Sequence, residues 1–118
     1  MELFPNASDK DIQLVKNLLH RYTRMRSTVL QLSKKEHPTE KEYQVLNEYQ
    51  KKTESIEMAI NLIVDDNVRR VMEFRFIRGN PRWGTVKRFD CVTDRSVDRR
   101  IVKGVGLVAE TMKLIGAI

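Results

Sequence analysis

The sequence contains little of what stabilises or anchors many small proteins. Its single cysteine, Cys91, excludes an intramolecular disulfide and fits a reducing compartment. Three prolines and five glycines are too few for the turns of a many-stranded β fold. No apolar run approaches the roughly 18 residues that a membrane span needs, and the N-terminus lacks a secretory signal pattern. We therefore expect a soluble, cytoplasmic protein with no membrane partner.

Motifs for catalysis or metal binding are also missing from the sequence. There is no Gly-rich phosphate loop and no zinc motif. His20 and His37 have no cysteine or carboxylate at metal-ligand spacing, so we expect both to be surface residues. Cys91 has no catalytic histidine nearby, which favours a packing role. The sequence thus predicts a protein that is not an enzyme and uses no cofactor and no metal.

Charge is the feature that the chain has in excess, and it is unevenly distributed. The 118 residues carry a net charge of +6. Between Val68 and Lys103 there are eleven Lys or Arg and four Asp or Glu, whereas the rest of the chain holds eleven and twelve. Such asymmetry indicates a nucleic-acid-binding part joined to a neutral scaffold. Binding to a membrane surface is the weaker interpretation, because the basic third also contains acids and lacks a one-sided apolar face.

The N-terminal half reads as two long helices. Ser8 and Asp11 form a capping box for the first helix, and Thr39 and Glu42 form one for the second, with Pro38 between them. The apolar stripe of the first helix comprises Ile12, Val15, Leu18, Leu19, Tyr22, Met25, Val29 and Leu32. That of the second comprises Leu46, Tyr49, Thr53, Ile56, Ile60 and Ile63. The 3-4 spacing favours amphipathic helices packed as an antiparallel hairpin.

Shorter helices are predicted to follow. Asp65 and Asp66 are good N-caps for a third helix, and Gly79 stands where its C-cap is expected. Its inward residues would be Val68, Val71, Met72 and Phe76. Asn80 would cap the next helix, with Pro81 at its first position. The inward face of that fourth helix would carry Trp83, Val86 and Phe89, so Trp83 is expected to be a packing residue.

The last predicted helix begins after Thr93, its expected cap, and is amphipathic. Its apolar stripe comprises Val97, Ile101, Val105, Val108, Met112 and Ile115. Gly104 and Gly106 each weaken a helix by about 1 kcal/mol relative to alanine. The sequence therefore leaves open whether this helix continues through them or breaks.

A short helix, a three-residue turn at 90–92 and a further helix make the helix-turn-helix pattern. Val92 would point inward from the turn, and Val97 with Ile101 would anchor the second helix. Arg95 and Arg99 then point away from the core, and we expect this ridge to read base edges. The predicted base-reading residues are Arg95, Ser96, Asp98, Arg99 and Lys103. The predicted phosphate-binding residues are Arg82, Lys87, Arg88, Thr93 and Arg100.

Residues 66–115 resemble a known family of regulators. The features are an arginine-rich helix ending in RFI, Trp83 three residues before Val86, Thr93 seven residues further on, and then RSVDRR. They are similar to the C-terminal region of phage-encoded late-transcription regulators of the RinA/ArpU type, which is itself similar to the σ70 region 4 helix-turn-helix. The resemblance implies an all-α protein that binds double-stranded DNA sequence-specifically and activates phage or prophage late genes in the cytoplasm of a bacterial host cell.

We therefore expect an all-α fold with a helical hairpin at 1–64, acting as scaffold or dimerisation element, and a σ70 region 4-like helix-turn-helix at 65–118. The hairpin either completes the core or forms a homodimer, and the sequence does not decide between these. One alternative function is a protein-binding adaptor that contacts RNA polymerase or another regulator without base-specific DNA binding. Another is a phage DNA-packaging subunit, which would assemble as a ring.

Overall fold

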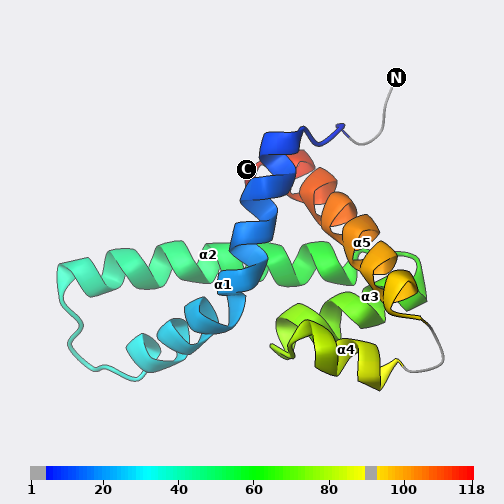
Figure 1. Cartoon of the computed structure of the whole chain (residues 1–118). Coiled ribbons are helices and arrows are strands. Elements are labelled where there is room, and N and C mark those ends of the chain that lie inside the picture. The colour runs from blue at the N-terminus through cyan, green and yellow to red at the C-terminus, as the bar shows by residue number, and fades with distance from the viewer. Residues whose placement is uncertain (1–4, 90–92) are drawn as a thin grey trace.

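The computed structural model describes residues 5–89 and 93–118, and over these residues the protein is all-α, as predicted (Figure 1). The elements are α1 (Asp9–Ser33), α2 (Glu40–Asn61), α3 (Asp66–Met72), the π-helical turn η1 (Glu73–Ile77), α4 (Arg82–Arg88) and α5 (Asp94–Leu114). No strand occurs in this part of the chain. The predicted turn at 90–92, with its expectations for Cys91 and Val92, lies outside the described residues.

The two long helices begin where the capping boxes predict. The Ser8 side chain accepts from the backbone N–H of Asp11, whose carboxylate accepts from the N–H of Ser8, and Thr39 and Glu42 repeat this arrangement. Figure 1 shows that α1 crosses α2 and bends along its length, so the end of the hairpin near Pro38 projects from the molecule. Thr28 Oγ1 donates to the carbonyl oxygen of Arg24 at 2.9 Å, a local bond of the kind that often bends helices.

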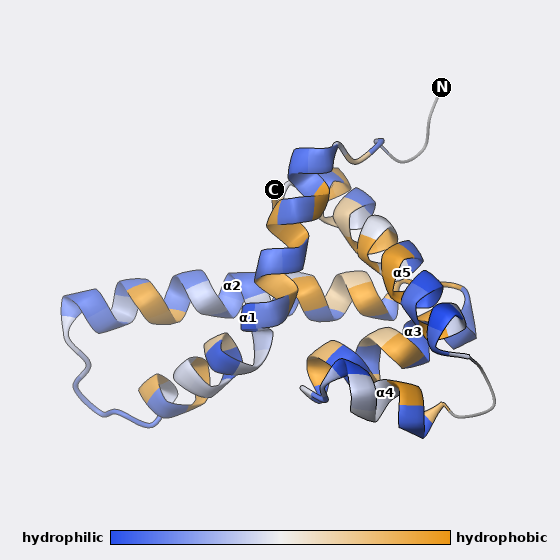
Figure 2. Ribbon diagram, in the orientation of Figure 1, coloured by the Kyte–Doolittle hydropathy of each residue, from blue (hydrophilic) through white to orange (hydrophobic). Residues whose placement is uncertain are grey.

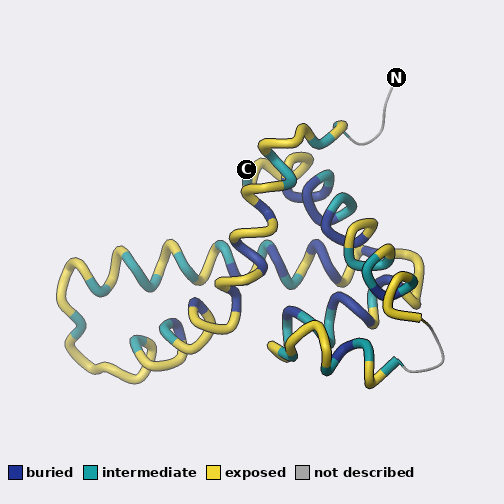
Figure 3. Tube along the Cα trace, viewed as in Figure 1, coloured by how far each residue is buried: buried dark blue, intermediate teal, exposed yellow. Residues whose placement is uncertain are grey.

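One hydrophobic core is shared by α1, α2, α3, η1 and α5 (Figures 2 and 3). Its buried residues are Val15, Leu18, Leu19, Tyr22, Met25, Ile56, Ala59, Ile60, Ile63, Val68, Met72, Phe76, Val105, Val108, Ala109 and Met112. The predicted stripes supply almost all of them. Because the cluster draws on both sides of residue 64, the hairpin and the C-terminal region stabilise each other rather than holding separate cores.

The connection from η1 to α4 differs from the prediction. Asn80 does not cap α4: its Nδ2 donates to the carbonyl oxygen of Phe74 at 2.9 Å, and its own carbonyl accepts from Arg75 Nη1 at 2.9 Å. Pro81 is instead the N-cap of α4, without a side-chain bond. Gly79 has a φ of 72°, and a Cβ on it would lie 2.7 Å from Cγ2 of Thr23. The turn is therefore fixed to the end of η1 and packed against α1.

The final helix α5 is continuous through Gly104 and Gly106, which settles the point that the sequence left open. Thr93 is its N-cap, as predicted, and Oγ1 of Thr93 accepts from the N–H of Ser96 at 3.1 Å. The predicted stripe is wrong at its last member, because Ile115 is the C-cap residue and is 43% exposed. The stripe ends there because the helix ends there.

Candidate nucleic-acid interface

The inward and outward faces of α5 follow the predicted pattern in its N-terminal turns. Val97 is 0% exposed, whereas Arg95 and Arg99 are both exposed to solvent. Neither arginine makes a hydrogen bond or ion pair with any residue in 5–89 or 93–118. One face of the helix is thus anchored in the protein, and the opposite face presents two free guanidinium groups.

The packing face of α4 is not the one predicted. Trp83 is 70% exposed, so the expectation that it packs in the core is wrong. The fully buried residue is Thr85, whose Oγ1 donates to the carbonyl oxygen of Pro81 at 3.0 Å. Phe89 is half-buried, and its ring meets that of Phe74 edge to face at a centroid distance of 5.8 Å. The contacts of α4 with η1 and α5 therefore select the side of Thr85, which leaves Trp83 on the outer surface.

A bidentate ion pair joins α4 to α5. Arg82 Nε lies 2.8 Å from Oδ1 of Asp98, and Arg82 Nη2 lies 2.8 Å from Oδ2. Hydrogen bonding to Asp98 raises the pKa of Arg82, and the same bonds lower the pKa of the Asp98 carboxyl below its ordinary value. Both oxygens of Asp98, a predicted base-reading residue, thus have a partner inside the protein. The pair thus links α4 to the exposed ridge of α5.

Three more of the predicted residues have partners within the fold. Thr93 Oγ1 donates to Oγ of Ser96 at 3.0 Å, and Lys103 Nζ lies 3.7 Å from Oδ2 of Asp65. By contrast, Lys87 and Arg100 form no hydrogen bond or ion pair with the described residues. Cζ of Arg88 lies 5.9 Å from the centroid of the Phe89 ring. The predicted set therefore divides into cations available to a ligand and residues that hold the local structure.

Basic residues outside the predicted set extend this surface onto α3 and η1. Arg70 and Arg78 are exposed and line a groove of about 200 Å³ together with Arg88. Neither residue is among the predicted DNA-binding residues. The excess of positive charge in the segment after Val68 was the signal that could have identified them.

The structure also bears on the metal and membrane predictions. Within residues 5–89 and 93–118, no group of three or more His, Cys, Asp or Glu side chains is placed to hold a metal ion. None of the described helices is long and apolar enough to cross a membrane. His20 and His37 are exposed, as predicted. The His20 ring packs edge to face against the Phe76 ring, with 5.7 Å between the ring centroids.

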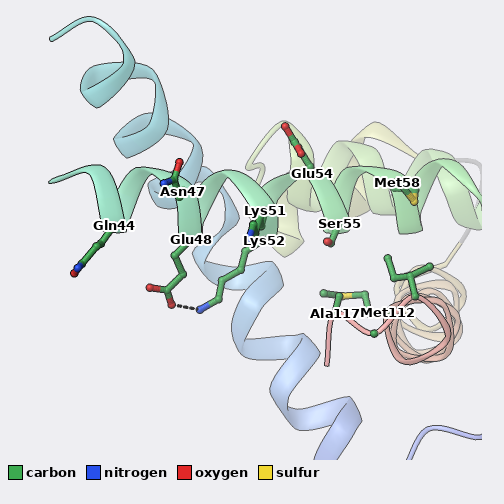
Figure 4. A pocket seen from close by; sticks show the side chains of 12 residues that line it. Gln44, Asn47, Glu48, Lys51, Lys52, Glu54, Ser55, Met58, Met112 and Ala117 are labelled. Carbon is green, nitrogen blue, oxygen red and sulfur yellow. Dashed lines mark hydrogen bonds and ion pairs between the residues drawn. The ribbon is translucent and has the colours of Figure 1, made fainter. Parts of the chain in front are cut away.

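A larger groove runs between α2 and the C-terminal end of α5 (Figure 4). It measures about 760 Å³ and mixes polar side chains such as Gln44 and Lys51 with apolar ones such as Met58 and Met112. Glu48 and Lys52, which also line it, pair with each other at 2.8 Å. None of the predicted site residues lines this groove, so it is separate from the basic surface.

Comparisons of the chain with protein-family models, curated proteins and solved structures found no significant match. The resemblance to phage late-transcription regulators therefore stays a prediction that depends on the sequence features of residues 66–115.

Proposed function

We propose that the protein binds double-stranded DNA sequence-specifically as a transcriptional regulator, with α5 as its recognition helix. The observation that carries this proposal is the pair Arg95 and Arg99 on the helix face opposite the fully buried Val97. Both are exposed and have no hydrogen-bond or ion-pair partner among the described residues. A helix of this kind fits the major groove. Arginine can bind O6 and N7 of guanine with two hydrogen bonds, which discriminates by about 1–3 kcal/mol.

The surrounding cations suit contacts to the DNA backbone. Lys87, Arg88 and Arg100 lie on α4 and α5 without ion-pair partners among the described residues, and phosphate contacts orient a protein without specifying sequence. In this proposal Arg82 and Asp98 hold α4 against α5, and Thr93 with Ser96 starts the recognition helix. The narrower role, an activator of phage or prophage late genes, depends on the resemblance alone.

An adaptor that contacts RNA polymerase or another regulator is the second candidate. Trp83 favours it, because a tryptophan that is 70% exposed is more typical of a protein interface than of a solvated surface. On this alternative the arginines of α5 meet an acidic protein surface. Dependence of binding on base sequence separates the two functions, since an adaptor has none.

The test is selection from a random duplex library at about 0.15 M salt. Wild type is compared with the Arg95→Ala/Arg99→Ala variant and with Lys41→Ala/Lys51→Ala, which removes the same charge from exposed positions of α2. We expect wild type and the α2 variant to enrich the same motif and the α5 variant to enrich none. Enrichment of no motif by any of the three would contradict base reading and favour the adaptor.

A second measurement separates base contacts from phosphate contacts. Lys87→Ala should weaken binding to selected and scrambled duplexes by the same factor and reduce the slope of log K against log salt by about 0.9. Arg95→Ala should instead weaken binding to the selected duplex most. Identical behaviour of the two variants would show that α5 does not read bases.

A further inference from the structure

A second group of arginines lies around a groove formed by α3, η1 and α4. The groove is lined by Arg70, Arg78 and Arg88, by the carboxylate of Glu73, and by the rings of Phe74 and Phe89. Its volume is about 200 Å³. Three arginines from three segments thus line one small hollow. Only Arg88 among them belongs to the predicted interface.

The aromatic rings hold two of these arginines in place. Cζ of Arg70 lies 6.0 Å from the centroid of the Phe89 ring, and Cζ of Arg88 lies 5.9 Å from it. Phe89 is itself packed edge to face on Phe74. A guanidinium within about 6 Å of an aromatic ring is attracted by its π-electrons. Both arginines are therefore positioned by the fold before any ligand binds.

The π-helical turn places the third arginine. In η1 the N–H of Arg78 donates to the carbonyl oxygen of Glu73, five residues earlier, at 2.9 Å. Arg78, at the end of this wider turn, lines the same groove as Glu73 and Phe74. The bonds of Asn80 to Phe74 and Arg75 then fix the chain that follows. π turns of this kind occur frequently at functional sites.

The charges in the groove are not balanced. Among the residues that the structure describes, Glu73 is the one carboxylate that lines the groove. Glu73 Oε1 lies 3.9 Å from Nε of Arg69, which also pairs with Asp66. Arg70, Arg78 and Arg88 form no ion pair with any residue that the structure describes. Like charges brought together repel one another, and a bound anion would relieve that repulsion.

We infer that this groove binds a phosphate group through the guanidinium groups of Arg70, Arg78 and Arg88. Guanidinium forms paired, charge-assisted hydrogen bonds with phosphate oxygens, which makes arginine suited to this ligand. The identification of that phosphate as part of the DNA backbone rests on the proposed function. A free phosphate ester offers the same chemistry, so the test must distinguish the two sources.

The experiment uses the 118-residue chain, with the selected duplex and inorganic phosphate as separate ligands. NMR signals of the arginine Nε–H groups report binding at each side chain. We expect the duplex to shift the signals of Arg70, Arg78 and Arg88, and Arg78→Gln to weaken binding to selected and scrambled duplexes alike, by about tenfold. Arg78→Lys, which keeps the charge, should recover part of this loss. Lys51→Gln, an exposed cation of α2, is the matched control, and circular dichroism checks that each variant is folded.

The outcomes separate the groove from the proposed function. If wild type selects a motif but Arg78→Gln weakens binding no more than Lys51→Gln, the groove does not bind phosphate and the proposed function stands. If wild type binds no duplex, yet phosphate shifts the three signals saturably and Arg78→Gln abolishes the shift, the groove is a site for a free phosphate ester and the proposed function fails. If neither ligand shifts the three signals, the inference is wrong.

Discussion

Gly104, in the middle of α5, faces the fully buried side chain of Met72 on α3. A Cβ on Gly104 would lie 2.5 Å from both Cγ and Sδ of Met72. A Cβ on Gly106 would meet no atom of the described residues within 4 Å, apart from those of its chain neighbours and of the local helix backbone. The two helices therefore approach closely because position 104 has no side chain. A glycine that weakens the helix locally by about 1 kcal/mol is what allows α5, with its exposed arginines, to pack on α3.

The two glycines of α5 should respond oppositely to alanine. Gly104→Ala forces Met72 to move within a filled core, and we expect a loss of about 1–3 kcal/mol in the free energy of unfolding. Gly106→Ala meets no neighbour and should raise that free energy by up to about 1 kcal/mol through helix propensity. Urea unfolding measures both changes: if the dependence of the free energy on urea concentration is the same in each variant, the shift of the midpoint reports the change in stability. Stabilisation by both variants would show that α3 and α5 have room to separate.

Replacing the exposed tryptophan should leave stability almost unchanged. Trp83→Ala removes a side chain that is 70% exposed, so the free energy of unfolding should change by no more than about 0.5 kcal/mol. Val97→Ala, at a position that is 0% exposed, should lower it by about 1–3 kcal/mol because buried methyl groups are lost. Thermal unfolding of the two variants gives the comparison. A larger loss for Trp83→Ala would place its ring in a packing role after all.

The hydroxyl of Tyr22 should contribute stability that high pH removes. Tyr22 is 3% exposed and donates to the Glu57 carboxylate, and burial, followed by the hydrogen bond to Glu57, raises the pKa of Tyr22 well above its ordinary value. A group whose pKa is raised by folding stabilises the protein below its unfolded pKa, about 10 for tyrosine.

Tyr22→Phe should therefore lower the free energy of unfolding by about 1 kcal/mol near neutral pH. The difference from wild type should shrink as the pH rises above about 10, because unfolding then releases a proton from wild type. Chemical denaturation of both proteins across this pH range measures the difference between their free energies of unfolding. Because the same lysines titrate in both proteins, their effect cancels in this difference. A difference that stays constant with pH would mean that the Tyr22 hydroxyl is not held as described.

Asp98→Asn should strengthen DNA binding without changing sequence preference. The substitution keeps the shape of the side chain but releases the charge of Arg82, which the structure pairs with Asp98. An additional phosphate contact should then increase the salt slope by about 0.9 for selected and scrambled duplexes alike. If the variant instead loses preference at one base pair, Asp98 reads that base and its pairing with Arg82 is broken in the complex.

Local sequence signals predicted the helix starts and the buried faces well where these depend on residues within one helix. The capping boxes at Ser8 and Thr39 lie at the observed helix starts, and the cap at Thr93 does too, because each depends on residues within one turn. The apolar stripes predicted the buried residues of the long helices, since burial of such a face follows the helical period.

Predictions failed where a short element has several neighbours. The seven residues of α4 contain too few turns for spacing to define one face, and the contacts with η1 and α5 decided that Thr85 rather than Trp83 is buried. Asn80 had a plausible local role as a cap, but the carbonyl oxygen of Phe74 competes for its amide. Nothing in the local sequence marked the π turn that brings this carbonyl within reach.

The sequence by itself determined the all-α class, the starts of the long helices, the buried stripes and the concentration of positive charge after Val68. These properties depend on interactions within a few residues or on composition. Only the tertiary structure decided which cations remain unpaired, because Asp98 meets Arg82 from another helix and Asp65 meets Lys103 across the fold. It also decided that Arg70, Arg78 and Arg88 share one groove, since helix packing, and not spacing along the chain, sets the distance between them.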